Sequence, residues 1–164
     1  MKTAKSLARA GVVGALYALL TIVLAPISYG PMQFRVSEAL TVLPLIFPET
    51  AIGLTIGCFI ANIFGNGPLD LVLGTVATFI ASLLTAWAGK KIVKTIPKLI
   101  IGILPPIIIN ALIVPFTFMI ASDTFLTYLY NASTVLLGQA VVICLLGPLL
   151  YFSVLKITER LKLK

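Results

Sequence analysis

Six polar side chains lie inside or at the ends of long apolar stretches, and they are the best candidates for chemistry in this chain. They are Glu38, Asn62, Asn66, Asp70, Asn110 and Gln139. Carboxylates accept hydrogen bonds, and side-chain amides both donate and accept them, so such a set suits the recognition of a polar organic ligand. Polar groups at membrane depth are costly and therefore need a partner or a function.

The residues needed for most catalytic and metal sites are missing. The chain has no His, so no Ser or Cys has the usual base to activate it. Cys58 and Cys144 lie apart in apolar stretches, which favours small buried residues over a disulfide or a thiolate metal site. Gly89-Lys90 has Leu84 where a P-loop needs its first glycine. We therefore predict a protein that is not an enzyme and holds no metal or cofactor, with any ATP used by partner subunits only.

The composition indicates a membrane protein. The chain is 60% hydrophobic and 10% charged, with a mean hydropathy of +1.14. A soluble domain of this length could not bury so much apolar surface. Since about 20 apolar residues cross a bilayer core, we predict one transmembrane domain over residues 1–164, all-α, with six helices at about 5–25, 36–47, 50–65, 69–89, 99–121 and 128–155.

The basic residues predict the orientation of these helices. Every Lys and Arg except Arg35 lies within residues 2–9, 90–98 or 156–164. Six alternating spans place these three clusters on one side, which the positive-inside rule identifies as the cytoplasm. We therefore predict a multi-pass protein with both termini cytoplasmic. The net charge of +7 fits this bias and anionic lipid headgroups, and it does not indicate nucleic acid.

In this topology none of the six polar residues clearly belongs to the cytoplasmic half of the membrane, which predicts one water-filled or ligand-filled cavity open to the outside. Simpler explanations exist for each. Asp70 could cap the helix that it begins, and Asn66-Gly67-Pro68 could be a turn. Asn110 and Gln139 could join helices by hydrogen bonds. Glu38 could pair with Arg35 at a spacing of i, i+3, and Glu49 could cap the third helix.

Two predicted helices carry stripes of small residues, which let helix backbones approach closely in lipid. The third predicted helix has Gly53, Gly57, Ala61 and Gly65, and packing within the chain is the simplest explanation. The first has Ala4, Ala8, Gly11 and Ala15, beginning at the predicted cytoplasmic edge. For this second stripe, docking of a partner protein competes with packing inside the chain.

The segment Tyr29-Gly-Pro-Met-Gln-Phe-Arg-Val-Ser-Glu-Ala-Leu-Thr-Val-Leu-Pro44, together with residues 62–65 and 68–70, resembles the signature of the QueT family. These proteins are substrate-binding S components of energy-coupling-factor (ECF) transporters. The resemblance implies the six-helix S-component bundle in a prokaryotic plasma membrane. It implies a queuosine precursor as substrate, 7-aminomethyl-7-deazaguanine or queuine. The implied partners are a transmembrane coupling protein and two cytoplasmic ATPase subunits. Ala4 and Ala8 match the Ala-x-x-x-Ala docking motif of helix 1.

For such a substrate, Glu38 is expected to accept both the N1–H and the exocyclic amine of the base. Asp70 would accept an aminomethyl cation. Donors to the carbonyl at position 6 are expected from Arg35, Asn62, Asn110 or Gln139, and aromatic faces from Phe34, Phe64, Tyr128 or Tyr130. Gln33 is expected to contact the substrate from a loop that acts as a lid, as the first loop does in S components. Two other functions compete: a self-sufficient secondary transporter, and an S component for a different vitamin-like molecule. A membrane subunit without a ligand is a further alternative.

Overall fold

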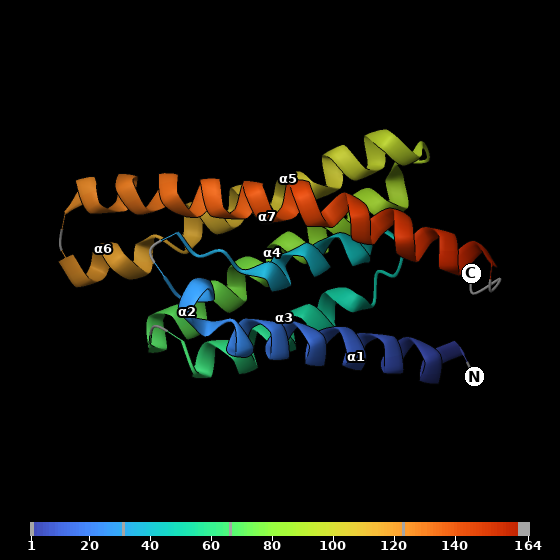
Figure 1. The fold of residues 1–164 in the computed structure, drawn as a ribbon, viewed down its shortest axis with the longest axis horizontal. Coiled ribbons are helices and arrows are strands. Elements are labelled where there is room, and N and C mark those ends of the chain that lie inside the picture. Colours follow the sequence, from blue (N-terminus) through green and yellow to red (C-terminus); the bar gives the residue numbers. More distant parts are fainter. Residues whose placement is uncertain (1, 31, 66, 123, 161–164) are drawn as a thin grey trace.

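The computed structural model describes residues 2–30, 32–65, 67–122 and 124–160, and every regular element within them is a helix. The elements, in chain order, are α1 (Lys2–Val23), α2 (Ala25–Ser28), the 3-10 helix η1 (Val36–Leu45), α3 (Thr50–Ile63), α4 (Pro68–Lys91), α5 (Thr95–Ile113), α6 (Phe116–Ser122) and α7 (Phe125–Arg160). The long helices run side by side along the long axis of the molecule (Figure 1).

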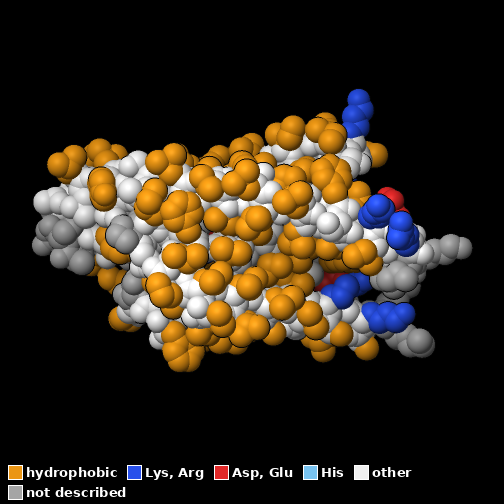
Figure 2. Space-filling model, in the orientation of Figure 1, with side chains coloured by type: hydrophobic (Ala, Val, Ile, Leu, Met, Phe, Trp, Pro, Cys, Tyr) orange, Lys and Arg blue, Asp and Glu red, His pale blue; other side chains and the backbone are white. Residues whose placement is uncertain are grey.

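The beginning of α1, the end of α7 and the connection between α4 and α5 lie at one end of the bundle (Figure 1). We call this the basic end, because residues 2–9, 90–98 and 156–160 belong to it. The Lys and Arg side chains visible in Figure 2 gather there, while hydrophobic side chains cover most of the rest of the visible face. The end of α3, the beginning of α4 and the beginning of α7 lie at the opposite end (Figure 1). This arrangement brings the three basic clusters together, as the topology requires.

Within the described residues, four helical segments are long and apolar enough to cross a membrane. They are Thr3–Val23, Pro68–Lys91, Thr95–Ile120 and Phe125–Arg160, while η1 and α3 are shorter. The prediction of an all-α, polytopic protein is therefore confirmed. The count of six full-length transmembrane helices is not, because two of the predicted six are short and another is divided in two.

Prolines account for two differences from the predicted helices. The segment expected to form an α-helix at 36–47 is a 3-10 helix, with Pro44 inside it. Proline lacks an N–H and clashes with the carbonyl four residues earlier, which disfavours α-helical hydrogen bonding. The helix expected at 99–121 begins at Thr95 and divides into α5 and α6 next to Pro115. The last helix is longer than expected and spans 36 residues.

The small residues of α3 pack against α1, as predicted. A Cβ built on Gly53 would lie 2.0 Å from the carbonyl oxygen of Ala10, and one on Gly57 would lie 2.3 Å from that of Gly14. Only glycine allows backbones to approach so closely. The other stripe of α1, consisting of Ala4, Ala8, Gly11 and Ala15, is exposed, and a Cβ on Gly11 would meet nothing within 4 Å.

Two single-residue predictions need correction. Glu49 occupies the N-cap position of α3 but makes no capping hydrogen bond. Its carboxylate instead pairs with Arg9 at 2.6 Å, and the Arg9 guanidinium lies 4.3 Å from the centroid of the Phe47 ring. Cys58 is buried as expected, but Cys144 is exposed on α7. The polar and apolar contacts of α3 with α1 therefore join the two helices along much of their length.

The core is built around η1, whose residues from Ser37 to Leu45 are all buried. This short helix contacts α1, α3, α4, α5 and α7. On one side Leu40 and Leu43 pack with Tyr17, Leu54 and Cys58. Because η1 lies at the centre, any polar residue at its beginning is enclosed by the surrounding helices.

Candidate functional site

Seven charged or amide side chains around the beginning of η1 are almost completely buried, each with no more than 3% of its surface exposed. They are Gln33, Arg35, Glu38, Asn62, Asp70, Asn110 and Gln139, and we call them the polar cluster. All seven were predicted to contact substrate. They come from the segment before η1, from η1 itself and from α3, α4, α5 and α7. Asn66, also predicted, lies outside the described residues.

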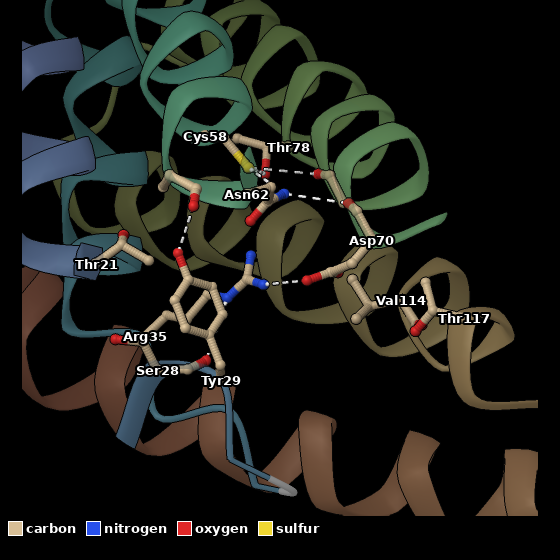
Figure 3. A network of polar contacts seen from close by, with 12 residues as sticks. Thr21, Ser28, Tyr29, Arg35, Cys58, Asn62, Asp70, Thr78, Val114 and Thr117 are labelled. Atoms are coloured by element: carbon tan, nitrogen blue, oxygen red, sulfur yellow. Dashed lines mark hydrogen bonds and ion pairs between the residues drawn. The ribbon is translucent and has the colours of Figure 1, made fainter. Parts of the chain in front are cut away.

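Arg35 and Asp70 form an ion pair at the centre of this region (Figure 3). The guanidinium Nη2 lies 3.2 Å from Oδ2 of Asp70, and both side chains are at most 2% exposed. Nε of Arg35 donates to the carbonyl of Ser28 at 3.4 Å. The predicted alternative in which Arg35 pairs with Glu38 is therefore wrong. Asp70 lies in the first turn of α4, where a carboxylate is favourable for the helix dipole, as the capping explanation expects. Its Oδ2 pairs with Arg35 and its Oδ1 has no hydrogen-bond partner among the described residues, so it does not cap the helix by a hydrogen bond.

Asn62 holds the beginning of α4 in place. Its Nδ2 donates to the backbone carbonyl of Asp70 at 3.2 Å (Figure 3). Gly74 provides the necessary space, because a Cβ there would lie 2.7 Å from Nδ2 of Asn62 and 3.2 Å from Oδ1 of Asp70. Nearby, Thr78 donates to the sulfur of Cys58 at 3.2 Å. A tight contact between α3 and α4 thus positions the carboxylate that meets Arg35.

Glu38 has a different set of neighbours. The Tyr17 hydroxyl of α1 donates to Oε1 of Glu38 at 2.5 Å. The Asn110 amide also interacts with this carboxylate, although its Nδ2 makes no well-formed hydrogen bond to any described atom. Oε2 of Glu38 has no hydrogen-bond partner among the described residues. Sequence reasoning missed Tyr17; the signal available was that a hydroxyl within an apolar helix needs a partner.

Tyr29 and the segment 32–35 together contact α3, α4 and α7. The Tyr29 hydroxyl, just before it, donates to the carbonyl of Ala61 in α3 at 2.6 Å, and the Arg35 guanidinium lies 5.6 Å from the Tyr29 ring (Figure 3). On α7, a Cβ on Gly138 would lie 2.0 Å from the carbonyl oxygen of Met32. Gln33 has a φ of 43°, which is unfavourable for a residue other than glycine. Such strain is often retained at functional sites.

Six atoms of the polar cluster lack a hydrogen-bond partner among the described residues. They are Nε2 of Gln33, Oε2 of Glu38, Oδ1 of Asn62, Oδ1 of Asp70, Nδ2 of Asn110 and Oε1 of Gln139. Leaving a buried polar atom unpaired costs about 1–3 kcal/mol, so such atoms are uncommon in native proteins. Their concentration around one short helix marks this region as the candidate ligand site.

The aromatic residues predicted to stack on a ligand are placed differently. Phe34 is half-buried beside the polar cluster in the sequence. Tyr128 is half-buried, and its ring lies 4.7 Å from that of Phe116, while its hydroxyl donates to the carbonyl of Leu112. Phe64 and Tyr130 are 66% and 63% exposed, and their stacking on a ligand stays a prediction.

Apolar helices around a buried polar cluster define a multi-pass membrane protein suited to handling a polar small molecule. The sequence model of the family described as "QueT transporter" matches residues 7–156, and the chain therefore belongs to that family. This membership places it among transporters and not among enzymes, as predicted.

One curated relative is the "Queuosine precursor transporter QueT" of Lactococcus lactis subsp. cremoris (strain MG1363). The two chains are 41% identical over 71 residues, which is 42% of this chain and 42% of the relative. The aligned part thus spans less than half of either protein. No solved structure matches this chain at a significant level.

Proposed function

We propose that this protein is the substrate-binding S component of an ECF transporter for a queuosine precursor. It binds a 7-deazaguanine base from outside the prokaryotic plasma membrane. It delivers the base inward when a transmembrane coupling protein with two ATPase subunits is docked to it. Support comes from the family, from the name of the relative and from the burial of the polar cluster inside the bundle.

The observation that carries this proposal is the buried Glu38 carboxylate with its unpartnered Oε2. A deazaguanine presents two adjacent donors, its N1–H and its exocyclic amine. A carboxylate has about four acceptor positions, so Glu38 accepts both donors while keeping the hydrogen bond from Tyr17. Charge-assisted hydrogen bonds of this bidentate kind are stronger than neutral ones.

The other groups of the polar cluster complement the rest of such a base. Gln33 and Asn110 have unpartnered amide nitrogens, which suit the carbonyl at position 6. Oδ1 of Asp70 is free to accept an aminomethyl cation while Oδ2 stays with Arg35. The segment 32–35 then forms part of the lid, and it is tied to α7 by the contact of Met32 with Gly138 and to α4 by the pair of Arg35 with Asp70.

A binding screen on the purified protein tests the proposal. Saturable binding of 7-aminomethyl-7-deazaguanine or queuine is expected by calorimetry, with no binding of thiamine or riboflavin. Binding of one of these vitamins in place of a deazaguanine would identify an S component for a different molecule. If no compound bound, the alternative of a membrane subunit without a ligand would replace the proposal.

A self-sufficient secondary transporter remains the second candidate, because Glu38 is a buried carboxylate without a cation paired to it among the described residues. Carboxylates of this kind serve in proton-coupled transport. Proteoliposomes containing this chain alone distinguish the two functions. The S-component proposal predicts uptake only after a coupling protein and ATPases are added with ATP, whereas gradient-driven uptake by the chain alone would favour the second candidate.

The exposed stripe on α1 is the proposed docking surface for the coupling protein. Ala8 lines an apolar groove of about 330 Å³ with Leu43, Phe47 and Val154, and Gly11 and Ala15 line a second groove between α1 and α3. Small side chains in these grooves allow another helix to approach closely.

Replacing Ala8 with Leu is expected to reduce ATP-driven uptake at least tenfold, since the larger side chain keeps the partner helix at a distance. Ligand affinity should change less than twofold, because Ala8 lies far from the polar cluster along α1. Cys144→Leu adds a similar bulk at an exposed position of α7 and serves as the control. Equal losses of uptake in both variants would show that the stripe has no special role.

A further inference from the structure

Tyr17 is fully buried in the middle of α1, and its hydroxyl reaches the carboxylate that the proposed function assigns to the substrate. The hydrogen bond to Oε1 of Glu38 measures 2.5 Å and joins residues 21 positions apart in the chain. A buried tyrosine hydroxyl usually finds a partner. What distinguishes this one is the partner, a buried carboxylate at the centre of the polar cluster.

The Tyr17 ring has little freedom to move. It packs in an apolar group with Val13, Leu40, Leu54 and Cys58. Close packing of this kind holds side chains in one rotamer. The hydroxyl is therefore presented to Glu38 from a fixed position, on a helix that approaches α3 at glycine contacts.

A second contact from α1 fixes the turn that carries Glu38. Thr21, one turn after Tyr17, donates to the Tyr17 carbonyl at 2.8 Å. Its Oγ1 also lies 2.6 Å from Oγ of Ser37, so Ser37 is the donor in that pair. Successive residues of η1, Ser37 and Glu38, are thus both held by α1.

Arg35, the cationic residue nearest to Glu38 in the sequence, does not form an ion pair with it. The Arg35 guanidinium pairs with Asp70 and with the Ser28 carbonyl. Among the described residues, Tyr17 provides the one well-formed side-chain hydrogen bond to the Glu38 carboxylate. A neutral phenol orients a carboxylate without cancelling its charge, whereas a guanidinium would occupy both oxygens as a bidentate partner.

We propose that Tyr17 is a positioning residue for substrate recognition: it fixes Oε1 of Glu38 so that Oε2 and the remaining acceptor positions stay available to two adjacent donors of the ligand. This inference rests on the proposed function and extends it to α1. A carboxylate that is already ordered loses less side-chain freedom when the ligand binds. Tyr17 therefore strengthens binding without touching the ligand.

A double-mutant cycle with Glu38→Gln tests this role. Tyr17→Phe keeps the ring and removes the hydroxyl, and it is expected to weaken binding of 7-aminomethyl-7-deazaguanine about tenfold. In the Glu38→Gln background the same change should alter affinity less than twofold, because Tyr17 acts through Glu38. Tyr151→Phe, which alters a tyrosine buried in the other core group, should leave affinity unchanged. A tenfold effect of Tyr17→Phe in both backgrounds would overturn the proposal.

The ligand-free protein provides a readout that does not depend on the substrate. In proteins labelled with ¹³C-glutamate, the infrared band that disappears in Glu38→Gln belongs to the Glu38 carboxyl group. Tyr17→Phe should shift that band and Tyr151→Phe should not. An unshifted band would refute the positioning role even if deazaguanines bind. If the band shifted but no deazaguanine bound, the hydrogen bond between Tyr17 and Glu38 would be supported and the proposed function would be contradicted.

Discussion

Replacing Glu38 with Gln is expected to raise the dissociation constant for 7-aminomethyl-7-deazaguanine about a hundredfold, the largest effect on binding of any single change. The substitution keeps the size of the side chain but replaces an acceptor oxygen by an amide that faces a ligand donor. It also removes the charge that strengthens the contact, and losing a hydrogen bond to a charged group costs about 1.5–3 kcal/mol. Calorimetry or equilibrium dialysis on purified protein measures the change.

The matched control is Glu49→Gln. Glu49 lies at the basic end, where it pairs with Arg9 and not with the polar cluster. Its replacement should leave ligand affinity within twofold of the unmodified protein. Near-normal ligand affinity after Glu38→Gln would show that Glu38 does not contact the ligand. The ligand contacts would then be expected around the Arg35–Asp70 pair.

Replacing Arg35 with Met is expected to destabilise the protein by about 3–5 kcal/mol, because it leaves the Asp70 carboxylate buried without a cation. The double variant Arg35→Met with Asp70→Asn should recover much of this loss, since no uncompensated charge remains. Thermal or denaturant unfolding in detergent compares the variants. Equal stability of the single and double variants would show that the ion pair does not govern folding here.

The Arg9–Glu49 pair offers a comparison within the same chain. Its side chains are 35% and 23% exposed, in contrast to 2% and 0% for Arg35 and Asp70. Arg9→Met should therefore cost no more than about 1 kcal/mol, the usual range for a pair that water reaches. A larger loss at Arg9 than at Arg35 would contradict the assignment of Arg35 and Asp70 to a dry interior.

These two predictions concern neighbouring but separate parts of the polar cluster. Glu38 is held by α1 and keeps acceptor positions for a ligand, whereas the Arg35–Asp70 pair ties the segment before η1 to α4. Loss of the Glu38 carboxylate should therefore affect ligand affinity more than the stability of the fold. Loss of the Arg35–Asp70 pair should affect stability first, and through the position of the segment 32–35 it should also affect ligand entry.

Several features could be predicted because they follow from local patterns. Long apolar stretches predict membrane helices, and the separation of Lys and Arg from them predicts that both termini share one end, as they do. The glycine ladder on α3 predicted close packing with another helix of the chain. Five residues of the polar cluster, Glu38, Asn62, Asp70, Asn110 and Gln139, could be found because a polar side chain inside an apolar stretch is rare and therefore informative. Gln33 and Arg35 were instead singled out through the family resemblance.

Other features depend on contacts between distant residues. Pro44 made the 3-10 geometry of η1 possible, but sequence alone does not show that its burial against five helices maintains it. Arg35 had a carboxylate three residues away and another 35 residues away, and it pairs with the distant one. The spacing of i, i+3 favours Glu38 as the partner of Arg35. The contact between α3 and α4 instead positions Asp70 next to the Arg35 guanidinium.

By itself, the sequence determined that this is a helical membrane protein with its basic residues at one end and a few polar residues within its apolar spans. These properties depend on the cost of transferring each side chain from water to lipid, which is a property of the residues themselves. Only the tertiary structure decided which buried charges meet and that Tyr17 faces Glu38. Such pairings depend on how the helices approach one another, and glycines far apart in the chain control that approach.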